Sequence, residues 1–583
     1  MPNGLVRATA RVAAYVVGLC VASAASAQRL PRDLELLVKP HLVDTAVSHV
    51  VVRMVMRGID VPASAPLLKM QMVAAGVNTA QYDASTLTVT DASGPVPLTQ
   101  ATEPKDPANN RYFRRWTAAR PVKGDLTVTY NGTPRRLPPG QWPGGPVMDM
   151  RAEDGGMNGR GGYFLVLPDD SATHRVRVRW DLSGIPAGAR GVWTHGEGDA
   201  TKVLTADKLA GTIFMAGPVK SYPAKADPTF NIYWLTEPSW NFAEVAPTVE
   251  KLFRYYGRLF EDTTHSLRIF MRRGRSNGGS GAGGSFLMYT PSADFNLPPM
   301  NIPGLIGFLA HEIFHQFPEQ LDDYDVGEPT YWWSEGMATY YSNLLAFRIG
   351  VKTLDQFLGN WNGFLANYYS DPNRLLSYKD ITSGMFGGPV GLNLMYAKGH
   401  AFMLLLNARI REKSGGTRSL DDLAFPLIRA HRRGERYTRA DFLAALDREL
   451  GLEGRALYEE FRAGGKLLDL PNNLLGPCFR RVGVTYRPFQ LGFDASAATT
   501  GERRVIRNLV ARSAAARAGV REGDEAVSAI DLGALRADTS ATLQLELRRS
   551  GQPVTVAYTP RGEPLDGFKW VREPSVPESA CKL

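Results

Sequence analysis

The sequence predicts a multidomain α+β protein, and three changes of pattern along its 583 residues lead to this prediction. Residues 28–235 alternate short runs rich in Val and Thr with clusters of Gly, Pro and Asn, which is typical of a β-sandwich-like domain. From residue 236 to 470 the apolar residues recur at helical spacing, which predicts a mainly helical domain. Residues 480–575 return to strand-like patterns and predict a smaller β domain.

The first domain contains the clearest strand patterns. Polar and apolar residues alternate in each of them, and turn-forming residues separate one from the next. The strongest strand predictions are residues 49–60, 85–94, 125–135 and 174–184.

The middle domain is predicted to contain a strand followed by several long helices. Pro303 suits the first turn of a helix that stops before Pro318, and we expect Ser334 to cap the next helix. The expected strand is residues 266–273, and the expected helices are residues 242–261, 303–317, 334–350, 353–369, 396–412 and 438–450.

The first 27 residues are typical of a secretory signal peptide. Arg7 and Arg11 precede an apolar run, and Ala25, Ser26 and Ala27 form a cleavage site with small residues. An uncleaved membrane anchor is the alternative, but the apolar run is short for a bilayer. No later stretch approaches a membrane span, so we expect a periplasmic or secreted mature protein.

Composition and charge are those of a globular protein, with 44% hydrophobic and 21% charged residues and a net charge of +9. The densest basic run, residues 429–441, is interrupted by acids and lies in a helical pattern. It therefore indicates a solvated helix face, and we expect no nucleic-acid partner.

Three cysteines are present, and Cys20 leaves with the signal peptide. Cys478 and Cys581 flank the last part of the chain in a compartment where disulfides persist. We therefore expect a disulfide that ties the two ends of this part together. Two free buried thiols are the alternative.

The stretch from residue 309 to 319, LAHEIFHQFPE, carries the sequence's most specific chemical pattern. His311 and His315 are four residues apart, so on a helix they share one face and can hold a single metal ion through their imidazoles. Glu312 points slightly aside, which suits a general base acting on water at the metal. A chance occurrence of the HExxH pattern is the alternative.

A third ligand supports the metal site. Glu335 follows His315 by twenty residues and opens the next helical pattern, so an antiparallel helix would return its carboxylate to the histidines. Three protein ligands and an open position are typical of catalytic zinc. An acid favoured by the dipole at a helix start is the alternative for Glu335.

Three motifs follow one another along the chain: HEIFH, WWSEGMATYY and YAKG, the last at residues 396–399. In this order they resemble those of the gluzincin metallopeptidases, in particular the glycyl aminopeptidase family. That family joins a β-rich N-terminal domain, a thermolysin-like zinc peptidase domain and a PDZ domain. The resemblance implies one Zn²⁺ per chain on His311, His315 and Glu335, with Glu312 as general base and proton shuttle. It further implies that Tyr396 donates a hydrogen bond to the oxyanion of the transition state. A packed aromatic residue is the alternative for Tyr396.

One departure from the family concerns the strand that lines the substrate cleft. Relatives carry there a glutamate that grips the free amino terminus, whereas GGSFLMY at residues 283–289 has no acid. An ammonium group buried without a carboxylate is poorly bound. Endopeptidase action or relaxed specificity is therefore an alternative to strict aminopeptidase action. We expect the substrate backbone to pair with Gly283, Gly284, Ser285 and Phe286.

Residues 504–531 resemble the core of a PDZ domain, and QLGF at residues 490–493 resembles its carboxylate-binding loop. About ten residues separate SAID from the next strand, too few for the usual helix of the peptide groove with its connections. We therefore expect a degenerate PDZ-like domain with a packing or regulatory role.

The residues together predict an exported zinc metallopeptidase that cuts peptides or proteins. A non-catalytic protein that binds partners through its PDZ-like domain is the alternative. Hydrolysis of a non-peptide amide or ester would use the same site.

Overall fold

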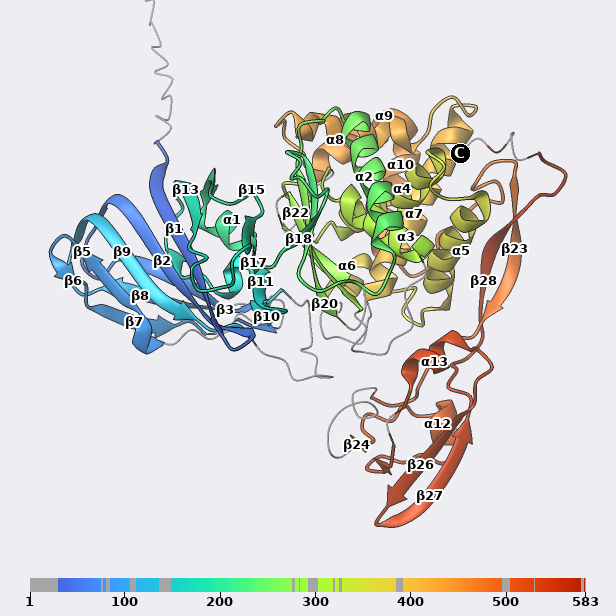
Figure 1. Ribbon diagram of the computed structural model, residues 1–583. Coiled ribbons are helices and arrows are strands. Elements are labelled where there is room, and N and C mark those ends of the chain that lie inside the picture. The colour runs from blue at the N-terminus through green and yellow to red at the C-terminus, as the bar shows by residue number, and fades with distance from the viewer. Residues whose placement is uncertain are drawn as a thin grey trace, which may run out of the picture.

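The described part of the chain falls into three regions along the sequence (Figure 1). This computed structural model describes residues 30–74, 77–79, 84–104, 112–135, 148–274, 278–282, 284–291, 302–317, 320–323, 328–383, 392–494, 504–528, 530–577 and 581. A β-rich region is followed by a helical region and a second β region, so the predicted multidomain α+β class is confirmed. The predicted signal peptide lies outside the described residues, and no described helix is long and apolar enough to cross a membrane.

The N-terminal region is built on a seven-stranded sheet. Its strands form because one face is apolar: in β13, Val176 and Val178 are buried while the arginines that alternate with them are exposed. In spatial order the strands are β16 (Ala200–Thr205), β13 (Thr173–Trp180), β1 (Arg32–Val43), β2 (Ala46–Val61), β9 (Val122–Gly132), β5 (Thr88–Asp91) and β6 (Gly94–Pro95). All four strand patterns predicted in this region fall on strands of this sheet.

Two smaller sheets and three short helices complete the region. One sheet contains β12 (Leu167–Pro168), β3 (Pro66–Ala74), β8 (Tyr112–Ala118) and β7 (Leu98–Thr102), with β4 (Val77–Asn78) paired to β3. The other contains β10 (Arg151–Glu153), β11 (Gly156–Arg160), β17 (Ile213–Gly217), β14 (Arg190–Trp193) and β15 (Gly196–Glu197). The short helices are η1 (Ala84–Thr86), η2 (Gly161–Tyr163) and α1 (Ala206–Ala210).

A five-stranded sheet lies between this region and the helices. Its order is β18 (Lys220–Tyr222), β19 (Phe230–Trp234), β20 (Leu267–Gly274), β22 (Ser285–Pro291) and β21 (Gly278–Ala282). In β22, Phe286 and Met288 join the core shared with the helices, whereas Leu287 packs with residues of β14 and β17. Both faces are therefore buried. Because β18 and β19 precede residue 235, this sheet crosses the domain boundary expected there.

The helical region surrounds the metal-site motif. Its helices are α2 (Phe242–Leu259), α3 (Ile302–Phe314), α4 (Tyr331–Arg348), α5 (Leu354–Ser370), α6 (Tyr378–Ser383), α7 (Leu392–Lys413), α8 (Leu420–Arg432), α9 (Arg439–Leu450) and α10 (Leu452–Ala463). The expectation that Ser334 caps a helix is wrong, because α4 begins at Tyr331 and Thr330 is its N-cap. The helix begins about one turn earlier than predicted because Trp332 and Trp333 are buried against Phe442.

Helices α4 and α7 cross with their backbones in direct contact. A Cβ atom added at Gly336 would lie 2.9 Å from the carbonyl carbon of Gly399, and one at Gly399 would lie 3.1 Å from the Cα of Gly336. Real Cβ atoms rarely approach backbone so closely, so glycine is needed at both positions.

The C-terminal region consists of a two-stranded stalk and a distal sheet (Figure 1). The stalk pairs β23 (Phe479–Tyr486) with β28 (Leu565–Arg572) and packs against α5. The distal part contains β24 (Arg504–Val505), β25 (Glu525–Ala526), β26 (Leu543–Arg549) and β27 (Gln552–Tyr558), with α12 (Ala514–Arg517) and α13 (Leu532–Ala537). The structure joins Cys478 and Cys581 in a disulfide with a Cα–Cα distance of 5.4 Å.

A helix occupies the connection that the sequence indicated to be too short for one. Helix α13, six residues long, lies between β25 and β26. Leu535 of α13 is buried in the same core as Leu491 of the QLGF stretch. The similarity of this region to a PDZ domain stays a prediction.

We expect Gly336→Ala to lower the free energy of unfolding by about 1–3 kcal/mol, because the added methyl group forces the α4 and α7 backbones apart. Urea denaturation measures this loss. Gly359→Ala is the matched control, since a Cβ at this helical glycine meets nothing within 4 Å. It should leave stability unchanged or raise it by up to about 1 kcal/mol. Equal stabilities of the two variants would contradict the proposed role of the crossing.

Candidate metal centre and active site

Helix α3 presents the two histidines of the HExxH motif. Leu305, Leu309 and Ile313 are buried and hold one face of the helix in the core. His311 lies in the last turn of α3, and His315 follows the end of the helix, where its amide still donates to the carbonyl of His311. Both histidines therefore point from the same side of the helix.

Three ligand atoms converge from α3 and α4. His311 Nε2 and His315 Nε2 each lie 3.2 Å from Glu335 Oε2, and they are 3.1 Å from each other. Among the described residues, this is the group of histidine and acidic side chains that could hold a metal ion. Tetrahedral zinc with bonds of about 2.0–2.1 Å separates its ligand atoms by roughly 3.3 Å, so the donor set and its spacing fit zinc.

The electrostatics of this group follow from burial and close contact. Burial alone would raise the pKa of Glu335, but the charges and hydrogen bonds of His315 and His311 outweigh it and hold that pKa well below its usual range. Burial likewise opposes the charge on His315, and the charge of Glu335 raises its pKa to about 9. Glu335 is therefore an anion, as a carboxylate ligand must be.

Glu312 lies beside the ligand group and lines a cavity. Burial is the main cause of its raised pKa, and Glu335 adds to the effect while His311 and His315 oppose it. A raised pKa makes this carboxylate a stronger base than an exposed glutamate. Burial raises the pKa of the Tyr289 phenol in β22, and the nearby charge of Glu312 raises it further.

Tyr396 faces the ligand group from the first turns of α7. Its ring centroid lies 5.8 Å from that of His311. Burial raises the pKa of Tyr396 well above its usual range, and the negative charges of Glu335 and Glu312 raise it further. The phenol therefore keeps its proton and is a hydrogen-bond donor. The structure thus brings together all five residues singled out from the HExxH, SEG and YAKG motifs.

The expected pairing of substrate with residues 283–286 needs correction. Ser285 and Phe286 belong to β22, which is paired with β20 on one side and β21 on the other, and both residues are buried. Gly284 forms the preceding turn with φ +84°, and its carbonyl accepts from the Arg268 amide. Gly283 lies outside the described residues. Backbone groups already used within the sheet cannot pair with a peptide, and β21 is the edge strand.

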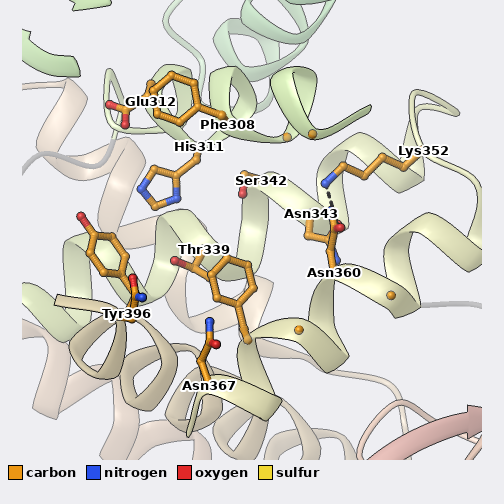
Figure 2. A pocket seen from close by; sticks show the side chains of 16 residues that line it. Phe308, His311, Glu312, Thr339, Ser342, Asn343, Lys352, Asn360, Asn367 and Tyr396 are labelled. Carbon is orange, nitrogen blue, oxygen red and sulfur yellow. Dashed lines mark hydrogen bonds between the residues drawn. The ribbon is translucent and has the colours of Figure 1, made fainter. Parts of the chain in front are cut away.

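A cavity of about 660 Å³ adjoins the ligand group, as Figure 2 shows. Residues of α3, α4, α5 and α7 line it, and Glu312 is the only acid among those described. Lys352, Asn343 and Asn360 form its polar end. These three residues were not predicted from the sequence, because nothing in the order of residues marks a lysine as buried.

The family model of the M61 glycyl aminopeptidases matches residues 304–384. This stretch includes His311, Glu312, His315 and Glu335, and it ends before Tyr396. A comparison with curated protein sequences finds no match.

Solved structures show a similar fold. An aminopeptidase N family protein from Idiomarina loihiensis superposes with a TM-score of 0.66 at 14% identity, covering 93% of this chain and 98% of that chain. Weaker similarities are an M1 zinc metallopeptidase from Deinococcus radiodurans (TM-score 0.44, 18% identity, 76% of this chain and 95% of that chain) and yeast LTA4 hydrolase (0.43, 13%, 75% and 68%). At such identities the similarities concern the fold alone.

The family match covers Glu312 and the three ligand residues, so the resemblance predicted from the sequence is confirmed. The chain is a hydrolase of the peptidase class, and its residues 304–384 are similar to the M61 glycyl aminopeptidases.

Proposed function

We propose that this chain is an exported zinc peptidase that holds one zinc ion through His311, His315 and Glu335. The observation that carries the proposal is the convergence of their ligand atoms at 3.1–3.2 Å beside a cavity lined by Glu312. Two imidazoles and one carboxylate leave a position open, which is the arrangement of catalytic zinc. When bound, zinc would supply Lewis acidity that polarises the peptide carbonyl and lowers the pKa of water.

Glu312 is proposed as the general base. Its carboxylate accepts a proton from the attacking water as the oxygen forms a bond with the peptide carbonyl carbon. The same carboxyl group then returns the proton to the nitrogen of the leaving amine, and the C–N bond breaks. The burial that raises its pKa favours the first of these steps, because a carboxylate with a higher pKa accepts a proton more readily.

Tyr396 is proposed to stabilise the transition state. The carbonyl oxygen becomes negative during attack, and a protonated phenol next to His311 can donate a hydrogen bond to it. The raised pKa of Tyr396 supports this role, since a phenolate would repel the developing charge.

We infer that the substrate backbone adds to the sheet at β21. An extended peptide pairs with an edge strand rather than with an interior one. Strand β21 pairs with β22 through the partners Gly278 and Tyr289, and Tyr289 is close to Glu312. A peptide on β21 would therefore run past the base.

Export is proposed from the N-terminal sequence pattern together with the Cys478–Cys581 disulfide.

Glu312→Gln should keep the zinc ion but lose activity by a factor of about 10²–10⁴, because the ligands remain and the base is removed. Metal analysis and kcat/KM on the same preparation test both parts. His315→Ala is the control that should lose the zinc as well. Substantial turnover by Glu312→Gln would contradict the assigned role.

Tyr396→Phe should retain zinc and lower kcat by a factor of about 10²–10³ with little change in KM, because the hydrogen bond forms only in the transition state. Steady-state kinetics on one peptide substrate test this expectation. An unchanged kcat would show that the phenol only packs against His311.

The cut position should distinguish the modes of action. Since Glu312 is the only acid among the described residues lining the cavity, we expect cleavage of library peptides with both free and acetylated amino termini, measured by mass spectrometry. Removal of single residues from free termini alone would establish a strict aminopeptidase. Zinc-loaded protein that cuts neither set would favour the alternative of a non-catalytic binding protein.

A further inference from the structure

Lys352 is a buried lysine in the wall of the cavity. It lies in the turn between α4 and α5, and only 6% of its surface is exposed. Its ammonium group donates to Asn343 Oδ1 at 2.7 Å, as the dashed line in Figure 2 marks. An ammonium has three hydrogens, so this single bond leaves two for another partner.

The surroundings of this ammonium are neutral. No carboxylate forms an ion pair with Lys352 among the residues that the structure describes, and burial is the cause that lowers its pKa, to about 8. The group is therefore mostly protonated at neutral pH. A buried charge normally has a counter-charge, because leaving water without one is costly. Its absence among the described residues points to a ligand that supplies it.

The polar groups around Lys352 are held in place. Asn343 Nδ2 donates to the carbonyl of Phe357, which fixes the amide so that Oδ1 accepts from Lys352 and, at 3.3 Å, from Asn360. Gly307 of α3 also lines the cavity, and an added Cβ there would lie 3.3 Å from Nζ. The absence of a side chain there keeps space open at the ammonium.

The ammonium lies within reach of the metal site. Gly307 precedes His311 by one turn of α3, and Asn343 follows Glu335 by two turns of α4, which correspond to about 6 Å and 12 Å along the helices. Figure 2 shows Glu312 and Tyr396 on one side of the cavity and Lys352 on the other. A short peptide spans such distances with two or three residues.

We propose that Lys352, Asn343 and Asn360 form a carboxylate-binding subsite that selects acidic peptides. The carboxylate comes either from an Asp or Glu side chain near the cleaved bond or from a free C-terminus. In both cases the carboxylate forms an ion pair with Lys352. It accepts hydrogen bonds from the remaining ammonium hydrogens and from the side-chain amide of Asn360. This inference rests on the proposed peptidase function.

The test compares cleavage of matched peptides. One pair differs by Glu against Gln near the cut, and the other by a free against an amidated C-terminus. In one of the two pairs, the wild-type enzyme should cleave the acidic peptide with a kcat/KM about 10–100 times that of its neutral partner. This factor corresponds to the strength of a buried charge-assisted hydrogen bond. The pair that shows the preference identifies the source of the carboxylate.

Two variants should abolish the preference. Lys352→Met removes the charge at similar length, and Asn360→Asp places a competing carboxylate beside the ammonium. The neutral peptides supply the reference rate for each variant, so the ratio of acidic to neutral cleavage is compared within one protein and a general loss of activity cancels. Lys251→Met is the matched control, because Lys251 is exposed and its ammonium donates to the carbonyl of Ile349 near the same turn. Wild type without a preference, or variants that retain it, would overturn the proposal.

A binding measurement separates this proposal from the peptidase function. Glutarate should bind zinc-loaded Glu312→Gln, neutral glutaramide should not, and adding Lys352→Met should abolish glutarate binding, as followed by calorimetry. Lys352-dependent glutarate binding, together with a zinc-loaded wild type that cuts no peptide, would support the subsite and overturn the peptidase function. Peptide cleavage without acid preference and without glutarate binding would overturn the subsite alone.

Discussion

The contact between Gly336 and Gly399 is the constraint on which the active-site geometry depends. It lets the backbones of α4 and α7 touch, one residue from Glu335 and three residues from Tyr396. A side chain at either glycine would move one helix, and the carboxylate would shift relative to the phenol. The glycines of SEG and YAKG therefore have a packing reason that is separate from the chemistry of the neighbouring residues.

The sheet that carries β21 and β22 positions the other side of the site. Its two faces are buried against the helices and against β14 and β17, so α3 rests on a layer that is itself supported from behind. Phe286 of β22 contacts Phe308 of α3, one turn before His311. The same burial removes water from the site, which is why the pKa values of Glu312 and Tyr396 are both raised. A base and a proton donor thus arise from one physical cause.

The sequence predicted the elements with strong local signals. The HExxH spacing requires a helix, and Thr353 with Gln356 forms a capping box at the predicted start of α5. The predictions failed where tertiary contacts decide. Burial of Trp332 and Trp333 extends α4 beyond Ser334, and strand order makes β21 rather than β22 the edge. The burial of Lys352 has no local signature, since it depends on helices that are distant in sequence.

Helix α5 links the cavity to the C-terminal region. Asn360 lines the cavity, whereas Asn362 accepts from the Trp570 amide and donates to the Trp570 carbonyl in β28. Successive residues on a helix are rotated by about 100°, so Asn360 and Asn362 point to nearly opposite sides: one face of α5 lines the cavity and the other meets the stalk. At Gly567 of β28, a Cβ would lie 2.5 Å from Tyr369, so the strand lies directly on the helix. The stalk therefore supports the wall that contains the proposed carboxylate subsite.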